Sequence, residues 1–219
     1  MTDELVVIVP VLDRPQNVRP LLDSWKASGT PGDLLLVATA TDEKEIAELE
    51  AARAGFDVTY MVTWPQKINW AVRYYDPEWF LFAADDITFV PGWWEATAEA
   101  RSKGRVVGTN DGANPRCIAG EHSTHTLVAR SYIEEHGTID ADEAVCSWYH
   151  HWYVDDELVW TAKHRDEWAH SGVLLPHHHP YFDENVLVDD TYRRGEANTE
   201  ADRALWQSRA RLLGLEVVF

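Results

Sequence analysis

The sequence predicts an α/β protein built on a doubly wound sheet. Apolar, β-branched runs alternate with capped amphipathic segments over residues 1–86. Most of these runs are continuous rather than alternating, which is typical of strands buried on both faces of a parallel sheet. The 219 residues, 45% of them hydrophobic, are enough for one domain with a sizeable core.

Each element has its own local signal in this order. Strands are expected at 5–11, 34–40, 56–63 and 78–84, with helices between them at 18–28, 43–55 and 66–75. Thr41 and Asp42 cap the second helix, and Gly55 ends it. Further along, the pattern predicts a helix at 93–103, a strand at 105–110, a loop at 110–123, a strand turning into a helix over 124–137, a helix from about 155 to 165 and a short strand from 172. An amphipathic helix follows at 195–214, with Thr199 as its cap and Gly214 as its stop.

Charge and cysteine content limit the function. Nineteen basic and 37 acidic side chains give a net charge of −18, which repels nucleic-acid backbones and disfavours a nucleic-acid partner. Phosphorylated small molecules would need a metal ion or a local basic cluster to bind. Cys117 and Cys146 lie far apart with no CxxC motif, so neither a disulfide framework nor a thiolate zinc site is indicated.

Targeting signals and tryptophan content give weaker information. The N-terminus lacks a basic region before its short apolar run, and no apolar stretch reaches membrane-spanning length. A soluble protein with no membrane span is expected, located in the cytoplasm, or in the host cytoplasm if the gene belongs to a phage. The eleven tryptophans suit stacking on sugar rings, although most tryptophans in any protein are core or interface anchors.

Candidate metal ligands occur at two places. Asp85 and Asp86 follow the fourth strand, and ligands of doubly wound sheets sit beyond the carboxyl ends of strands. Carboxylates there suit Mg²⁺ or Mn²⁺, although most such pairs are helix caps or solvated turns. In the run 177–179, an extended chain points His177 and His179 the same way, so either could complete a Mn²⁺ site. The alternative is a surface histidine cluster.

Asp155 and Asp156 open a predicted helix directly after an aromatic segment. The helix dipole alone makes acidic residues favourable in the first turn of a helix, so their presence there needs no catalytic explanation. The functional alternative makes one of them a general base that deprotonates an acceptor hydroxyl, while Trp152 or Tyr153 packs on the acceptor. Spacing alone does not decide between these interpretations.

Nucleotide-binding candidates also follow the strands. Neither a GxGxxG nor a GxxxxGK[ST] motif is present, so a dinucleotide fingerprint and a P-loop are excluded. Asp42 could accept the imide N–H of a uracil, and Arg14 or Lys67 could meet a phosphate. For at least half of these positions, helix capping or surface charge is the expected explanation instead. The full candidate set is Pro10, Val11, Asp13, Arg14, Thr39, Asp42, Lys67, Asn69, Ala84 and Asp85.

The order of these motifs resembles the GT-A fold glycosyltransferases of the family 2 type, over roughly residues 5–182. The segments that carry the resemblance are VVIVPVLDRPQNVRPLLDSW, LLLVATATD, WFLFAADDITFVPGWWE, VDDELVWTAK and LLPHHHPYF. The resemblance implies one GT-A (Rossmann-like) α/β domain over 1–219, with a mixed central sheet and a C-terminal helix. Within it, 1–92 would bind the nucleotide sugar, 93–192 would complete the metal and acceptor sites, and 193–219 would form a helical extension.

The resemblance also implies an inverting, metal-dependent transfer from a nucleoside-diphosphate sugar, with a UDP-sugar favoured. Mn²⁺ or Mg²⁺ would be held by Asp85, with Asp86 and His177 or His179, and Asp155 or Asp156 would be the base, with Asp155 favoured by the match to the family. The first acid of the family's DXD-type motif is replaced here by Ala83. A glycan, a protein or a modified base remains open as acceptor. A nucleotidyltransferase, a non-catalytic sugar-binding module and a metallohydrolase are the rival functions.

Overall fold

The computed structural model describes residues 4–139 and 142–214 of the chain. Residues 1–3 and 215–219, the two ends of the expected single domain, therefore lie outside the described residues. Residues 1–3 also belong to the N-terminal segment that was expected not to be a signal peptide. The strands are β1 (Leu5–Pro10), β2 (Asp33–Thr39), β3 (Phe56–Thr59), β4 (Trp79–Phe82), β5 (Val106–Asn110), β6 (Thr126–Ala129) and β7 (Trp168–Leu174).

These strands form one mixed sheet in the order β3-β2-β1-β4-β6-β5-β7. Strands β3, β2, β1 and β4 run parallel to one another, whereas β6 pairs antiparallel with both β4 and β5, and β7 runs parallel to β5. The predicted α/β architecture with a mixed sheet is confirmed. Because β1 and β4 are adjacent, the chain segments that leave their carboxyl ends emerge side by side.

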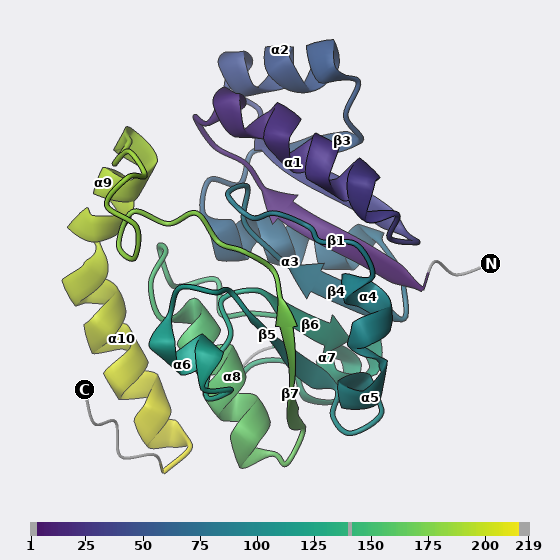
Figure 1. The fold of residues 1–219 in the computed structure, drawn as a ribbon. Helices are drawn as coiled ribbons and strands as arrows, with labels where there is room; N and C mark the ends of the chain where they lie inside the picture. Colours follow the sequence, from purple (N-terminus) through teal and green to yellow (C-terminus); the bar gives the residue numbers. More distant parts are fainter. Residues whose placement is uncertain (1–3, 140–141, 215–219) are drawn as a thin grey trace.

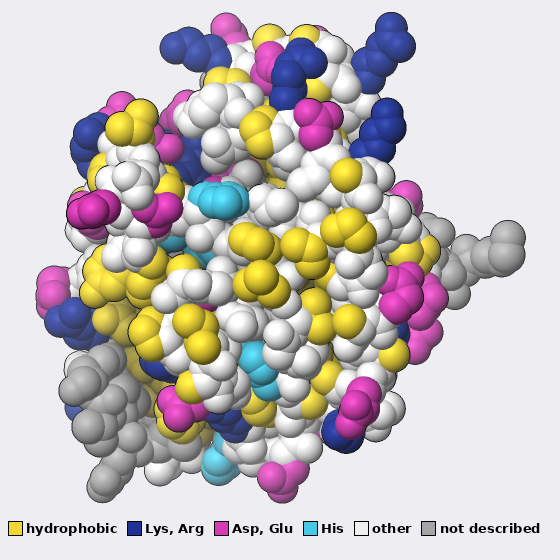
Figure 2. Space-filling view, viewed as in Figure 1, with side chains coloured by type: hydrophobic (Ala, Val, Ile, Leu, Met, Phe, Trp, Pro, Cys, Tyr) yellow, Lys and Arg dark blue, Asp and Glu magenta, His cyan; other side chains and the backbone are white. Residues whose placement is uncertain are grey.

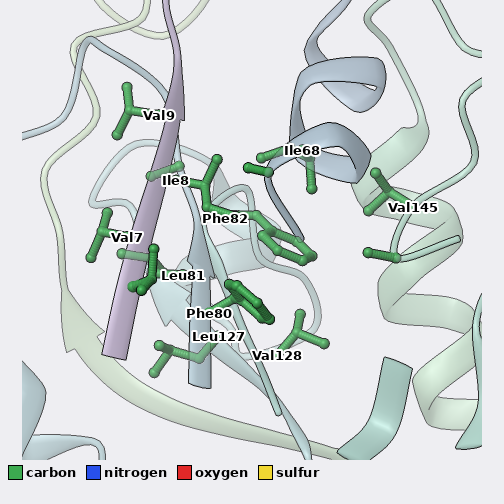
Figure 3. Close-up of a cluster of buried hydrophobic side chains, with 14 of the residues drawn as sticks. Val7, Ile8, Val9, Ile68, Phe80, Leu81, Phe82, Leu127, Val128 and Val145 are labelled. Atoms are coloured by element: carbon green, nitrogen blue, oxygen red, sulfur yellow. The ribbon is translucent and has the colours of Figure 1, made fainter. Parts of the chain in front are cut away.

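The core lies on both faces of the central strands. Figure 3 shows the alternation expected of a strand, with Val7 and Val9 on one face of β1 and Ile8 on the other, beside Phe82 of β4. Phe80 and Phe82 point to the same side as Ile68. All these side chains are buried, so strands 5–10 and 79–82 are held rigidly beneath the residues that follow them.

Ten helices cover the sheet and flank it in the described part of the chain: α1 (Pro15–Ser28), α2 (Glu43–Ala52), α3 (Trp64–Tyr74), α4 (Trp93–Ala96), α5 (Ala98–Arg101), α6 (Pro115–Ile118), α7 (Arg130–His136), α8 (Val154–His164), α9 (Asp190–Ala197) and α10 (Thr199–Leu212). Figure 1 shows α9 and α10 along one flank, with the arrowhead of β1 directed toward α9. Figure 2 shows visible Lys and Arg side chains most densely over α1 and α2.

Several boundaries differ from the sequence predictions. Helix α2 ends at Ala52 rather than at Gly55, because Arg53 takes the left-handed cap conformation with φ of 55°. The expected helix at 93–103 is two short helices that meet at Thr97. The expected loop at 110–123 contains α6, which Asn114 caps.

The C-terminal part differs as well. Strand β7 begins at Trp168, four residues before the expected 172. The expected helix at 195–214 is two helices, α9 and α10, that meet at Asn198, so Thr199 is a first helical residue and Asn198 is the cap. No described helix is both long enough and apolar enough to cross a bilayer.

Candidate active site at the carboxyl edge of the sheet

Two adjoining cavities lie at the carboxyl edge of the sheet. The central cavity, of about 320 Å³, is lined by these predicted site residues: Arg14, Ala84, Asp86, Trp152, Tyr153, Asp155, Asp156, His177 and His179. The side cavity, of about 280 Å³, is lined by Pro10, Arg14, Lys67, Ala84 and Asp85 among others. Arg14 and Ala84 line both, so the two cavities are neighbours. A small molecule is usually bound in such concave sites.

Arg14 joins the acids that follow β4 to helix α9. Its Nη1 lies 2.7 Å from Asp85 Oδ1 and 3.0 Å from Asp86 Oδ2, and its Nε donates to Asp189 Oδ2 at 2.8 Å. The guanidinium also stacks over the Tyr192 ring at 4.1 Å. In this arrangement the buried guanidinium of Arg14 is the shared positive partner of three carboxylates.

The histidine run lies beside the acidic pair, as the predicted metal site requires. His177 Nε2 lies 3.1 Å from Asp86 Oδ1, and residue 177 forms a β-bridge with Ile87. His178 turns away, because its backbone N–H donates to Asp86 O and its Nε2 lies 2.9 Å from Thr88 Oγ1. His179 packs its ring against Tyr192, 4.7 Å between centroids. Asp85 differs from Asp86 in facing the side cavity.

Burial and charge set the protonation of this group in opposite directions. Burial raises the pKa of Asp85 to about 6. Asp86 is equally buried, but His177 and Arg14 hold its pKa well below the usual value. Burial lowers the pKa of His179 to about 4. A neutral imidazole and an ionised carboxylate are the forms that bind a cation. Asp86 raises the pKa of His177, so His177 would have to release its proton to bind one.

The central cavity also contains buried polar atoms that make no hydrogen bond. They include His177 Nδ1, Trp152 Nε1 and both ring nitrogens of His125. His125 packs edge-on against His177 with 4.6 Å between ring centroids. Unsatisfied buried donors and acceptors are costly, and their concentration in one cavity indicates a place built for a polar ligand.

Helix α10 positions the segment that leads into Asp155. Asp202 accepts hydrogen bonds from the backbone N–H groups of His150, His151 and Trp152 at 2.9–3.0 Å. Tyr153, the N-cap of α8, has a left-handed backbone with φ of 65°, which a non-glycine residue adopts only when its surroundings impose it. The Asp202 contacts supply that constraint and aim α8 at the cavity.

A buried ion pair fixes α8 against α10. Arg209 Nε and Nη2 donate to the two carboxylate oxygens of Glu157 at 2.6 and 2.8 Å. Tyr149 Oη donates to Glu157 Oε2 at 2.8 Å. The first turn of α8, which carries Asp155 and Asp156, is therefore held at both its entrance and its inner face.

Two residues near this turn were missed from the sequence. His122 Nε2 lies 3.1 Å from Asp155 Oδ2, and Arg116 Nη2 donates to Asp156 Oδ1 at 2.8 Å. Among the described residues, His122, Asp155 and Asp156 are also a set whose ligand atoms lie within 4.8 Å of one another. Both missed residues belong to the segment interpreted as a loop, whose only sequence signal was polar side chains between two strands.

Five other predicted nucleotide-binding residues lie outside the linings of both cavities: Val11, Asp13, Thr39, Asp42 and Asn69. Asp42 uses one oxygen for Asp13 N–H and the other to cap α2 at Glu45 N–H. Asn69 binds the backbone of residues 144 and 145 through both its oxygen and its nitrogen. In this conformation these two side chains stabilise the loops around the site.

Lys67 and Thr39 are likewise engaged with the backbone. Lys67 Nζ donates to Val11 O at 2.6 Å, and burial lowers the pKa of this ammonium to about 8. Thr39 Oγ1 donates to Met61 O at 2.9 Å. Of the predicted phosphate-binding residues, Arg14 thus presents its charge between the two cavities, whereas Lys67 points its charge at the segment after β1.

The architecture is the GT-A fold of the glycosyltransferases. Glucosyl-3-phosphoglycerate synthase from Mycobacterium tuberculosis, in complex with Mn²⁺, UDP and glucosyl-3-phosphoglycerate, is similar with a TM-score of 0.66 and 11% identity, covering 98% of this chain and 81% of that chain. A mannosyltransferase from Pyrobaculum calidifontis, in complex with GDP-Man and Mn²⁺, has a TM-score of 0.59 and 13% identity, covering 98% of this chain and 75% of that chain. No protein-family model and no curated protein matches the sequence.

Proposed function

We propose that this protein is a metal-dependent glycosyltransferase that moves a sugar from a nucleoside-diphosphate sugar, with a UDP-sugar favoured, to an acceptor hydroxyl with inversion. The observation that carries the proposal is that the central cavity contains both the Asp86–His177 pair and the Asp155–Asp156 pair. A metal–diphosphate site and a general base must share one cavity for a single displacement. The likeness to structures that hold Mn²⁺ with UDP or GDP-Man supports this assignment.

The residues present fit a divalent cation. His177 Nδ1 is buried without a hydrogen bond, Asp86 Oδ1 lies 3.1 Å from His177 Nε2, and a carboxylate with an imidazole suits Mn²⁺. We assign these two residues as ligands, with Asp85 and His179 as further candidates, and Mn²⁺ or Mg²⁺ as the ion. When bound, the cation would neutralise the negative charge of the leaving diphosphate, which the net charge of −18 otherwise repels.

The chain's own residues have separate tasks around the donor. Arg14 borders both cavities, so its guanidinium can pair with diphosphate oxygens if it exchanges a carboxylate partner for them. The side cavity beside Pro10 and Lys67 is then the place for the nucleoside. We retain Val11, Asp13, Thr39 and Asp42 as the supporting layer of that pocket, because their contacts fix the loops after β1, β2 and β3. We also retain Asn69, whose contacts hold the backbone of residues 144 and 145.

On the acceptor side, Asp155 or Asp156 takes the hydroxyl proton while Trp152 and Tyr153 form the apolar wall. The acceptor oxygen forms its bond to the anomeric carbon as the bond from that carbon to the diphosphate breaks. The aromatic wall excludes water, which would otherwise compete as acceptor.

Thermal unfolding with ligands tests the proposal. UDP with Mn²⁺ should raise the melting temperature more than either alone, and Asp86→Asn should remove the gain due to Mn²⁺. Asp183→Asn, an exposed acid outside both cavities, is the matched control. If neither UDP nor GDP, with Mn²⁺ or Mg²⁺, changes the melting temperature, the donor assignment is wrong. Donor hydrolysis across UDP-, GDP- and dTDP-sugars then identifies the nucleotide.

A further inference from the structure

His122 is a buried histidine whose imidazole faces the first turn of α8. The side chain is 2% exposed, and its Nε2 lies 3.1 Å from Asp155 Oδ2. Its backbone N–H donates to Arg116 O, and the next residue, Ser123, accepts from Thr109 N–H and donates to His125 O. The imidazole is thus carried by a fixed loop, so its contact with Asp155 does not depend on a flexible side chain at the surface.

The two adjacent aspartates have different partners. Asp156 Oδ1 is paired with Arg116 Nη2 at 2.8 Å, whereas the nearest approach of His122 to Asp156 is 3.9 Å. Asp155 accepts from its neighbour's backbone N–H through Oδ1 and meets His122 through Oδ2. The Asp155 side chain is also the more exposed, 27% against 14%. Asp155 is therefore the aspartate that is open to an acceptor and coupled to an imidazole.

We propose that His122 and Asp155 act as one base, in which His122 stores the proton that Asp155 removes from the acceptor hydroxyl. This inference rests on the proposed function and selects Asp155 over Asp156. His122 acts through Asp155 and does not touch the acceptor, so it is a positioning residue with a proton-holding role. An imidazole in this place is useful because a general base works best with a pKa near the working pH, which an isolated aspartate does not have.

The proton balance of one turnover is closed within these groups, and between turnovers the proton returns from His122 through Asp155, whose side chain is 27% exposed, to solvent. The acceptor O–H proton moves to the Asp155 carboxylate as the acceptor oxygen bonds to the anomeric carbon, and the electron pair of the broken bond leaves on the diphosphate. The proton then passes from Asp155 Oδ2 to His122 Nε2, which must be unprotonated beforehand. If His122 is already protonated, it cannot accept the proton from Asp155, and the transfer to the acceptor stops.

The electrostatics of the pair agree with this order of events. Burial lowers the pKa of His122, but the Asp155 carboxylate outweighs it and raises the pKa above the usual value. Partial burial acts to raise the pKa of Asp155, yet His122 holds that pKa below the usual value. The other charged or titratable groups around the pair are Arg116 and Asp156, together with His125 and His151, whose pKa values are both lowered by burial. A proton that enters the pair therefore resides on His122.

The same three side chains could instead hold a cation, since His122, Asp155 and Asp156 offer ligand atoms within 4.8 Å. Arg116 opposes that use, because it already places a positive charge 2.8 Å from Asp156. The proton store is therefore the interpretation that accounts for Arg116 as well as for His122.

Histidine ring NMR tests the pair without any activity. The apparent pKa of His122 should lie above 6.5 in the wild type and should fall by about one pH unit or more in Asp155→Asn. His164→Asn, which removes an exposed histidine of the same helix, should leave the His122 titration unchanged. An identical His122 titration in wild type and Asp155→Asn would overturn the proposal. So would loss of the His122 signal on adding Mn²⁺ alone to Asp86→Asn, since the cluster would then be a cation site.

The pH dependence of UDP-sugar turnover with Mn²⁺, for the donor that the hydrolysis screen selects, tests the role of the pair. In the wild type, kcat should fall on the acid side at the pKa of His122. In His122→Asn it should be lower by about 10²-fold, and its acid limb should move to lower pH, toward the titration of an isolated aspartate. An acid limb that stays in place despite the lower rate would show that His122 is merely structural. If no nucleotide sugar is turned over, the proposed function fails, whereas the NMR result still decides whether the pair exists.

Discussion

The hydroxyl of Tyr192 donates to Asp86 Oδ2 at 2.6 Å, so helix α9 reaches the carboxylate that follows β4. These residues are separated by 106 positions in the chain. Arg14, stacked on the Tyr192 ring, binds the same carboxylate oxygen. Asp86 Oδ2 thus already accepts from Tyr192 and Arg14, and a cation that bound this oxygen would have to displace these donors or share the oxygen with them.

Tyr192→Phe should therefore bind Mn²⁺ more tightly than the wild type, because the carboxylate loses a competing donor. The metal-free variant should be less stable by about 1 kcal/mol, the contribution of one hydrogen bond. Calorimetric titration with Mn²⁺ and chemical denaturation measure the two effects. Tyr181→Phe, at a side chain that is 76% exposed, is the control. Weaker Mn²⁺ binding in Tyr192→Phe would mean that the hydroxyl supports the ion rather than competing with it.

Arg14→Met should destabilise the metal-free protein by about 3 kcal/mol, since Asp85, Asp86 and Asp189 would lose their shared counter-charge. Added Mn²⁺ should restore part of this loss, because the ion supplies positive charge at the same acids. Urea denaturation with and without Mn²⁺ measures both. Arg19→Met, at a largely exposed ion pair with Glu48, should change stability by less than about 1 kcal/mol. An Mn²⁺ effect equal in wild type and Arg14→Met would contradict the explanation.

Glu45 should make the protein less stable as the pH rises. Burial raises its pKa to about 7, and the nearby Asp42 and Asp85 act in the same direction, opposed by Lys67 and by the hydrogen bond from Arg14 N–H. The folded state then binds a proton more tightly than the unfolded state, whose carboxyl has the ordinary glutamate pKa of 4.5. The stabilisation is complete below about pH 4.5 and is lost as the pH rises through 7.

Between pH 5 and 8, the free energy of unfolding should fall by about 2 kcal/mol less in Glu45→Gln than in the wild type. The amide oxygen of glutamine can still accept from Arg14 N–H, so the loop should be retained. Urea denaturation across the pH range makes the comparison, with Glu50→Gln on the exposed face of α2 as control. An unchanged pH slope in Glu45→Gln would show that another group titrates.

His125→Phe should stabilise the ligand-free protein by about 1 kcal/mol, because two buried ring nitrogens without hydrogen bonds are replaced by carbon. The same change should reduce the thermal stabilisation by UDP with Mn²⁺ if those nitrogens serve a ligand in the central cavity. Thermal and chemical denaturation of the one variant give both results. A less stable free protein would show that the imidazole has a structural role.

The sequence was sufficient for the order of strands and helices over residues 1–86, because apolar runs such as 5–10 and 79–82 and caps such as Asp42 act locally. It was also sufficient to bring the histidine run to the acidic pair, because the positions of both followed from the family resemblance. It was not sufficient for the partners of Arg14, one of which lies 175 positions away, or for His122, whose loop carries no periodic pattern. Such contacts arise only when the sheet brings distant loops to one edge.

The hold of α10 on the Asp155 segment has a consequence for biosynthesis. Asp202, which fixes the backbone at Trp152, follows it by 50 positions, and Arg209 follows Glu157 by 52. During translation the parallel strands can pair long before either anchor leaves the ribosome. The Asp155 segment would therefore be the last region to acquire its native geometry, and a nascent chain stalled before residue 202 would carry a nearly finished sheet with the first turn of α8 not yet anchored.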